Sequence, residues 1–165
     1  MSLIAVSDFT GRWKIPVPFD GNAKLQAYID YYEPKYLNDL FGAELYVLFA
    51  AGVTAETEIY EKLNEPFAFD SDIIEEPVMS MGVNHMLKCL IYAHYWSEDL
   101  AISTSVGKVE IVPEAGKLQN DNYNNNMAYY NEGIKTYKAI QMYIEENLST
   151  YPTFKGVKRG LTWFF

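Results

Sequence analysis

The side chains best suited to chemistry in this sequence are His85 and Cys89, which lie four residues apart in a strongly apolar segment. A helix would place them on one face, and imidazole and thiolate are ligands that zinc prefers. Two ligands do not close a metal site, and His94, nine residues after His85, falls on roughly the opposite side of the helix. We therefore expect no metal, cofactor or catalytic residue, but a packed thiol and a hydrogen-bonded core histidine.

A second candidate is the densest group of carboxylates, which lies in residues 65–77. Its members are Asp70, Asp72, Glu75 and Glu76. Carboxylates act as general acid and base when their surroundings move their pKa values apart, and a loop of this composition offers no such surroundings. We expect a solvated acidic loop here, and plain surface charge for the pair Glu145–Glu146 near a helix end.

The third candidate is a small basic cluster near the C-terminal end of an otherwise acidic chain. Its charges belong to Lys155, Lys158 and Arg159. They are either a solubilising tail or, together with nearby aromatic rings, a segment that docks on an acidic neighbouring surface. In a homo-oligomer that neighbour could be another copy of the chain. The docking interpretation predicts these partner-binding residues in the tail: Phe154, Lys155, Lys158, Arg159, Trp163, Phe164 and Phe165.

The composition predicts one ordinary globular domain of 165 residues, because 49% of the residues are apolar and no linker divides the chain. The net charge of -9 makes nucleic acid an unfavourable partner. A single cysteine excludes an internal disulfide, the first residues do not form a signal peptide, and no stretch reaches the ~20 apolar residues of a membrane span. We expect a protein made and kept in the cytoplasm, with no membrane contact.

Aromatic residues make up 16% of the sequence, including 14 tyrosines. Tyrosine and tryptophan are enriched at protein interfaces because one end of the ring is apolar and the other can form hydrogen bonds. The rings either fill the core or meet a partner, and both interpretations stay open.

The elements that position these residues are predicted to be helical, and the fold class all-α. We expect a bundle of four to five helices in residues 22–148, an extended N-terminal arm in 1–21 and an aromatic tail in 149–165. In the tail, packing on its own domain and docking on a neighbour are equally open. A short β-hairpin or loop should protrude at 104–112, because Val109 and Ile111 alternate with charged residues. Its partner-binding candidates are Val106, Lys108 and Val109.

Prolines and glycines set the expected helix boundaries. Pro34 should start a new helix or a kink, and Gly42 should end a helix or form a tight turn. Thr54 is an N-cap candidate for a helix that ends near Asn64. Pro77 suits the first position of a helix over 78–103 that is apolar on most sides and therefore central. Apolar residues at steps of three and four predict a long last helix over 118–148.

The order of these segments resembles the head–tail connector proteins of tailed bacteriophages, also called head-completion or adaptor proteins. The opening segment 28–46 (YIDYYEPKYLNDLFGAELY) is similar to their helix, leucine-rich turn ending in glycine, and second helix. The helix end at 95–100 (YWSEDL), the loop at 104–109 (TSVGKV) and the long helix around 129–134 (YYNEGI) follow in the same order. The resemblance covers residues 22–150, and the aromatic C-terminus is not part of the pattern.

The resemblance implies a structural virion protein without enzymatic activity. Connector proteins form closed rings of about a dozen copies beneath the portal, extend the DNA channel toward the tail, and are often monomeric until they meet the portal. Expected partners are therefore other copies, the portal, and tail or further connector proteins, and DNA passes without sequence-specific binding. Two other hypotheses remain: a small cytoplasmic adaptor or regulatory domain of a bacterium, and an enzyme with an unrecognised site around His85 and His94.

Overall fold

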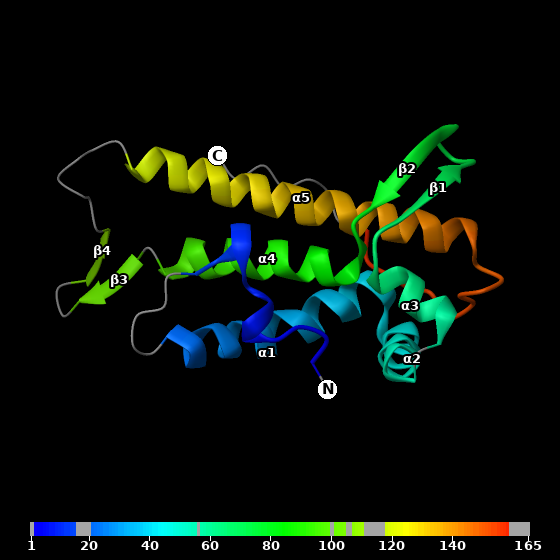
Figure 1. Cartoon of the computed structure of the whole chain (residues 1–165), viewed down its shortest axis with the longest axis horizontal. Coiled ribbons are helices and arrows are strands. Elements are labelled where there is room, and N and C mark those ends of the chain that lie inside the picture. The colour runs from blue at the N-terminus through cyan, green and yellow to red at the C-terminus, as the bar shows by residue number, and fades with distance from the viewer. Residues whose placement is uncertain are drawn as a thin grey trace.

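The fold is built around two long antiparallel helices, α4 (Gly82–Asp99) and α5 (Leu118–Glu146). A third helix, α1 (Gly21–Phe41), packs along the other side of α4, which therefore lies in the middle of the layer (Figure 1). The computed structural model describes residues 2–15, 21–55, 57–99, 101–104, 107–110 and 118–158. The expected central position of the helix after residue 78 is confirmed.

Helix α4 is central because its apolar residues point in several directions and pack against α1 on one side and α5 on the other. Val83, Met86, Leu87, Leu90 and Ile91 are completely buried. Burying a side chain of this size contributes ~1.5–3 kcal/mol relative to leaving it in water. These five residues therefore supply a large part of the driving force that holds α1 and α5 against α4.

Two short helices close one end of the layer: α2 (Ala43–Thr54) and α3 (Glu58–Asn64). Gly42 separates α1 from α2 with a φ of 77°, which confirms the expected turn. The predicted N-cap at Thr54 is wrong, because this residue ends α2 and its hydroxyl donates to the carbonyl of Ala50.

The mostly helical class is confirmed, but the described residues also contain two antiparallel β-hairpins. Strands β3 (Ala101–Thr104) and β4 (Gly107–Glu110) form the hairpin expected between α4 and α5, a few residues earlier than predicted. Strands β1 (Phe67–Ser71) and β2 (Glu76–Ser80) form a second hairpin where the sequence predicts an acidic loop. The two hairpins project from opposite ends of the α4–α5 pair (Figure 1).

The second hairpin forms because one face of it is apolar. The rings of Phe67 and Phe69 lie 4.9 and 5.2 Å from the ring of Tyr143 on α5. Pro77 sits opposite Asp70 in β2, so the helix expected to begin at this proline instead begins at Gly82. A two-stranded sheet has only edge strands, where proline is tolerated.

Helix α1 continues through Pro34, where the sequence predicts a new helix or a kink. Proline in a helix interior costs about 3 kcal/mol. The burial of residues on both sides of it, among them Ile29, Tyr32, Tyr36 and Leu37, offsets that cost. Tertiary packing therefore overrides the local signal, and α1 runs as one element over 21 residues.

The described part of the N-terminal segment, residues 2–15, is not the expected extended arm. It forms two 3-10 turns, η1 (Val6–Asp8) and η2 (Gly11–Trp13), and packs against the helices. The buried carboxylate of Glu33 on α1 accepts hydrogen bonds from the hydroxyl of Ser2 at 2.7 Å and the amide of Leu3 at 2.8 Å. A carboxylate that accepts several hydrogen bonds holds this segment on the body of the molecule.

The described part of the C-terminal tail, residues 149–158, folds back on its own domain. The amide of Val157 donates to the carbonyl of Asp39 at 2.7 Å, and the amide of Lys155 to that of Phe41 at 3.1 Å. The buried amide of Gln141 on α5 donates to the carbonyl of Leu40 between them at 3.1 Å. Consecutive carbonyls at the end of α1 thus receive donors from two distant segments.

Replacing Gln141 with Met should destabilise the fold by about 1–3 kcal/mol, because it leaves the buried carbonyl of Leu40 without its side-chain donor. Chemical denaturation would measure the change. Gln26→Met is the matched control: the side chain of Gln26 donates to Asp30 on the exposed face of α1, and its loss should change stability by less than about 0.5 kcal/mol. Equal effects of the two substitutions would contradict this role for Gln141.

Tyr151 should make the fold sensitive to alkali. Burial raises the pKa of its phenol well above the ordinary value of 10.0, and its hydroxyl donates to the carbonyl of Ile59 at 2.9 Å. Above about pH 10 the unfolded chain loses this proton while the folded chain keeps it, so stability falls as the pH rises. Tyr151→Phe should cost ~1 kcal/mol at pH 7, and this difference should shrink or reverse at pH 11.

Denaturation of both proteins at the two pH values would test the Tyr151 prediction. Tyr31→Phe serves as the control, because the ring of Tyr31 is exposed. A Tyr151→Phe deficit that stays constant from pH 7 to pH 11 would show that the phenol does not report on folding.

Candidate functional site

A cluster of ionisable side chains lies where η2 crosses α4 and α5. His85 and Cys89 come from α4, Glu132 from α5, and Arg12 and Trp13 from η2. The Nε2 of His85 is 2.8 Å from the Oε1 of Glu132 and 3.5 Å from the Sγ of Cys89. His85 and Cys89 therefore share one helix face, as their spacing predicts, and the fold adds a carboxylate and a cation to them.

Helix packing brings Glu132 to the two α4 residues. The next residue on α5 is Gly133, and a Cβ atom there would lie only 2.7 Å from the Cγ of Leu90 and 3.3 Å from the Cβ of Cys89. The missing side chain allows the two helices to approach closely at this point. Glu132 consequently reaches across the helix contact to His85.

Arg12 supplies the positive charge of the cluster. Its guanidinium forms an ion pair with Glu132, and its Nη2 is 3.9 Å from the Sγ of Cys89. The same guanidinium lies 4.5 Å from the ring centre of Trp13 and 5.4 Å from that of Tyr129. The hydroxyl of Tyr129 donates to the carbonyl of Arg12 at 3.0 Å, so the backbone of η2 is fixed as well as the side chain.

The surroundings set the charges at neutral pH. Burial lowers the pKa of His85 despite the neighbouring carboxylate of Glu132, and burial followed by the charge of Glu132 raises the pKa of Cys89 to about 11. Burial opposes the ionisation of Glu132, but the hydrogen bonds from Arg12 and His85 outweigh it and lower that pKa. A neutral imidazole bonded through Nε2 to an ionised carboxylate carries its proton on Nε2.

This protonation pattern does not fit nucleophilic catalysis. An active cysteine needs a lowered thiol pKa and a base that can accept its proton, whereas the Cys89 thiol stays protonated and the Nε2 of His85 is already protonated. The arrangement can instead hold η2 on the helices, and its imidazole, thiol and carboxylate are ligand types for a metal ion. These three ligand atoms all lie within 4.8 Å of one another.

His94 does not belong to this cluster. Its Nε2 is 2.7 Å from the hydroxyl of Tyr36, and its ring stacks on Tyr32 at 4.0 Å with an angle of 10° between the planes. The ring of Tyr130 meets it edge-on at 6.2 Å. The two histidines thus have different described neighbours, and the fold does not bring them together into one site.

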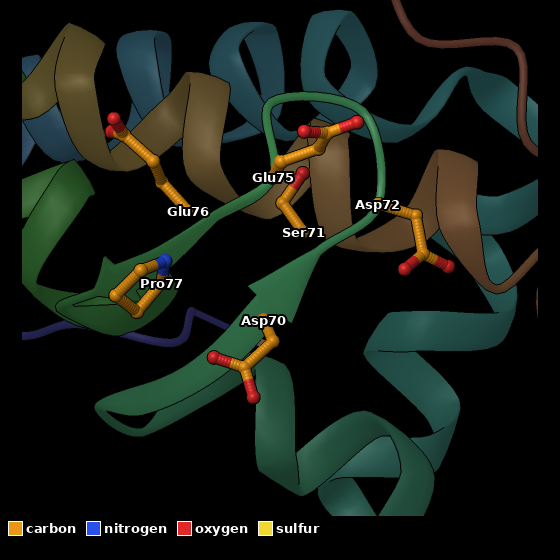
Figure 2. A pocket seen from close by; sticks show the side chains of 6 residues that line it. All are labelled: Asp70, Ser71, Asp72, Glu75, Glu76 and Pro77. Atoms are coloured by element: carbon orange, nitrogen blue, oxygen red, sulfur yellow. The ribbon is translucent and has the colours of Figure 1, made fainter.

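Residues 70–77 form the far end of the β1–β2 hairpin. A shallow, open hollow there is lined by four acidic residues together with Ser71 and Pro77 (Figure 2). Figure 2 shows the carboxylates of Asp70, Asp72 and Glu76 pointing in different directions. The hydroxyl of Ser71 donates to Glu146 on α5, which also accepts from the amide of Ile73. The sequence predicts plain surface charge at Glu146. This prediction is wrong, because Glu146 anchors the hairpin to α5.

The basic cluster is engaged within its own chain where the structure describes it. The Nζ of Lys155 is 3.1 Å from Glu44, and that of Lys158 is 2.9 Å from Glu145, both at exposed positions. Phe154 packs against the core. The remaining predicted partner-binding residues are placed as follows: Lys108 and Val109 in β4, and Val106, Arg159, Trp163, Phe164 and Phe165 outside the described residues.

Comparison with protein-family models, with curated proteins and with solved structures finds no match for this chain. Among the described residues, no helix combines the length and the apolar character needed to cross a lipid bilayer.

Sequence reasoning missed three members of the cluster: Arg12, Trp13 and Glu132. The first two lie in a segment without periodicity, and Glu132 looks like one more solvated charge on a long helix. The available signal was Gly133, because an isolated glycine inside a helix marks a close approach of another backbone or side chain.

A double-mutant cycle on Arg12→Gln and Glu132→Gln should give a coupling free energy below about 1 kcal/mol, because solvent screens a pair that is 45% and 36% exposed. Denaturation of the four proteins would measure it. The control cycle is Lys155→Gln with Glu44→Gln, whose ion pair is more exposed and should couple more weakly. A larger coupling in the control pair would contradict the role of the Arg12–Glu132 ion pair in holding η2 on the helices.

Proposed function

We propose that this chain is a structural protein of the head–tail junction of a tailed bacteriophage, one subunit of a ring beneath the portal. The observation that carries the proposal is the order of its elements. Helix α1, the turn at Gly42, helix α2, the central helix α4, the β3–β4 hairpin and the long helix α5 occur in the order that the connector resemblance predicts, with α3 and the β1–β2 hairpin inserted between α2 and α4. The proposal rests on this order of elements and not on the chemistry of a site.

The disposition of the hairpins suits a subunit of a closed ring. Head-to-tail contact around a ring requires two different patches on each subunit. In Figure 1, the β1–β2 and β3–β4 hairpins project from opposite ends of the α4–α5 pair. Either hairpin can therefore reach a neighbouring subunit while the helical layer stays intact.

The β1–β2 hairpin has the surface character of a protein contact. Ile73, Ile74 and Met79 are exposed on it, and the first two lie in the chain between Asp72 and Glu75, two of the acidic residues that line the hollow. Apolar residues within a polar rim are the common anatomy of an interface. The acidic rim favours a basic partner surface on the portal or on a neighbouring copy.

The charge of the chain suits a channel wall. A net charge of -9 disfavours tight association with phosphate groups, so DNA could pass a ring of such subunits without being held. In this proposal the protein is part of the virion, and DNA is its cargo but not a sequence-specific ligand.

Sedimentation velocity and electron microscopy of the purified chain, alone and with the portal protein of the same phage, would test the proposal. We expect a monomer alone and closed rings on the portal. A chain that stays monomeric with the portal but captures a single bacterial protein would favour the adaptor hypothesis instead.

A matched pair of charge variants makes the test specific to the hairpin. Asp72→Lys with Glu75→Lys reverses the acidic rim and should abolish ring assembly, whereas Glu58→Lys with Glu61→Lys makes the same change of charge on exposed α3 and should leave assembly intact. Circular dichroism would confirm that both variants are folded. Equal assembly by both variants would exclude the β1–β2 hairpin as the contact.

A further inference from the structure

We propose that His85, Cys89 and Glu132 form a binding site for a divalent metal ion of the zinc class, and that Arg12 occupies the cation's place when the metal is absent. The proposal goes beyond the ring function and does not rest on it. It follows from the positions of three ligand atoms and one guanidinium at the crossing of η2 with α4 and α5.

Two of the three distances between the ligand atoms are close to those of a tetrahedral zinc site, and the third, from the Sγ of Cys89 to the carboxylate of Glu132, is at most 4.8 Å. Zinc bonds of about 2.0–2.3 Å at tetrahedral angles place neighbouring ligand atoms roughly 3.3–3.6 Å apart. The Sγ of Cys89 already lies 3.5 Å from the Nε2 of His85. The Oε1 of Glu132 is 2.8 Å from the same nitrogen and needs to move outward by about half an ångström, which a half-exposed carboxylate can do by rotation.

The ligand types select the metal. Imidazole and thiolate favour zinc and cobalt, whereas calcium and magnesium prefer oxygen ligands in larger numbers. Binding forms a bond between the Cys89 sulfur and the metal and releases the thiol proton to solvent. Transfer of the Nε2 proton of His85 to its Nδ1, through solvent, frees the ligating lone pair. Three protein ligands leave the fourth position open to water or to a group from a partner.

Arg12 is the competitor at this site. Its guanidinium neutralises Glu132 and lies 3.9 Å from the Cys89 sulfur, so it satisfies the two groups that would hold the metal. Its side chain is 45% exposed and can move into solvent. The ammonium of Lys88, 4.5 Å from the ring centre of Trp13, adds a second positive charge nearby. The metal must therefore displace Arg12, and removal of Arg12 should strengthen binding.

Titration of the full chain with Co²⁺, followed by absorption, tests the site directly. We expect a thiolate-to-cobalt charge-transfer band together with the intense visible bands of tetrahedral cobalt, and loss of both on addition of Zn²⁺. Cys89→Ser should abolish the charge-transfer band, and Glu132→Gln should weaken binding by about tenfold or more.

Two further variants separate competition from a general change in charge. Arg12→Gln should bind Co²⁺ roughly tenfold more tightly, because no guanidinium has to leave. Lys14→Gln removes one positive charge at an exposed position two residues away and should leave the affinity unchanged.

Three results would overturn the proposal: no charge-transfer band in either the original chain or Arg12→Gln, a band that persists in Cys89→Ser, or equal affinities in Arg12→Gln and Lys14→Gln. Circular dichroism of each variant shows that it is folded. None of these results bears on ring assembly, so the two proposals fail or succeed separately.

Discussion

A helix that ends inside a protein leaves carbonyl groups that need hydrogen-bond donors. At the end of α1, these donors come from α5 and from the C-terminal segment. The carbonyls of Asp39, Leu40 and Phe41 receive hydrogen bonds from Val157, Gln141 and Lys155. A buried carbonyl without a donor costs ~1–3 kcal/mol. The requirement therefore joins α1, α5 and the C-terminal segment at one place, and it fixes how the α4–α5 pair lies against α1.

The fold could be predicted from the sequence where one face of a segment is apolar at helical spacing. The long helix α5, the turn at Gly42 and the hairpin between α4 and α5 all followed from local pattern. The β1–β2 hairpin could not be predicted in this way. Its acidic residues and Pro77 are typical of a loop, and the alternation of Phe67 and Phe69 is too short a pattern to indicate a strand. The helix through Pro34 was missed for a related reason: packing on α4 decides it, and the local signal does not contain that packing.

The candidate site shows the same division between local and distant information. The spacing of His85 and Cys89 was enough to place them on one helix face. Their partners Arg12 and Glu132 are separated from them by dozens of residues, and only the crossing of η2 with two helices selects them. The charges then follow from burial, which keeps the imidazole neutral and the thiol protonated while Arg12 keeps the carboxylate ionised.

The hydrogen bonds of residues 155–157 also decide where this chain can be shortened. The last residues of a domain are poorly ordered unless packing or hydrogen bonds hold them, and α5 ends at Glu146. Here the amide groups of Lys155 and Val157 complete the end of α1. A truncated version that stops at the end of α5 would expose the tip of a different helix, so the smallest self-sufficient unit extends at least through Val157.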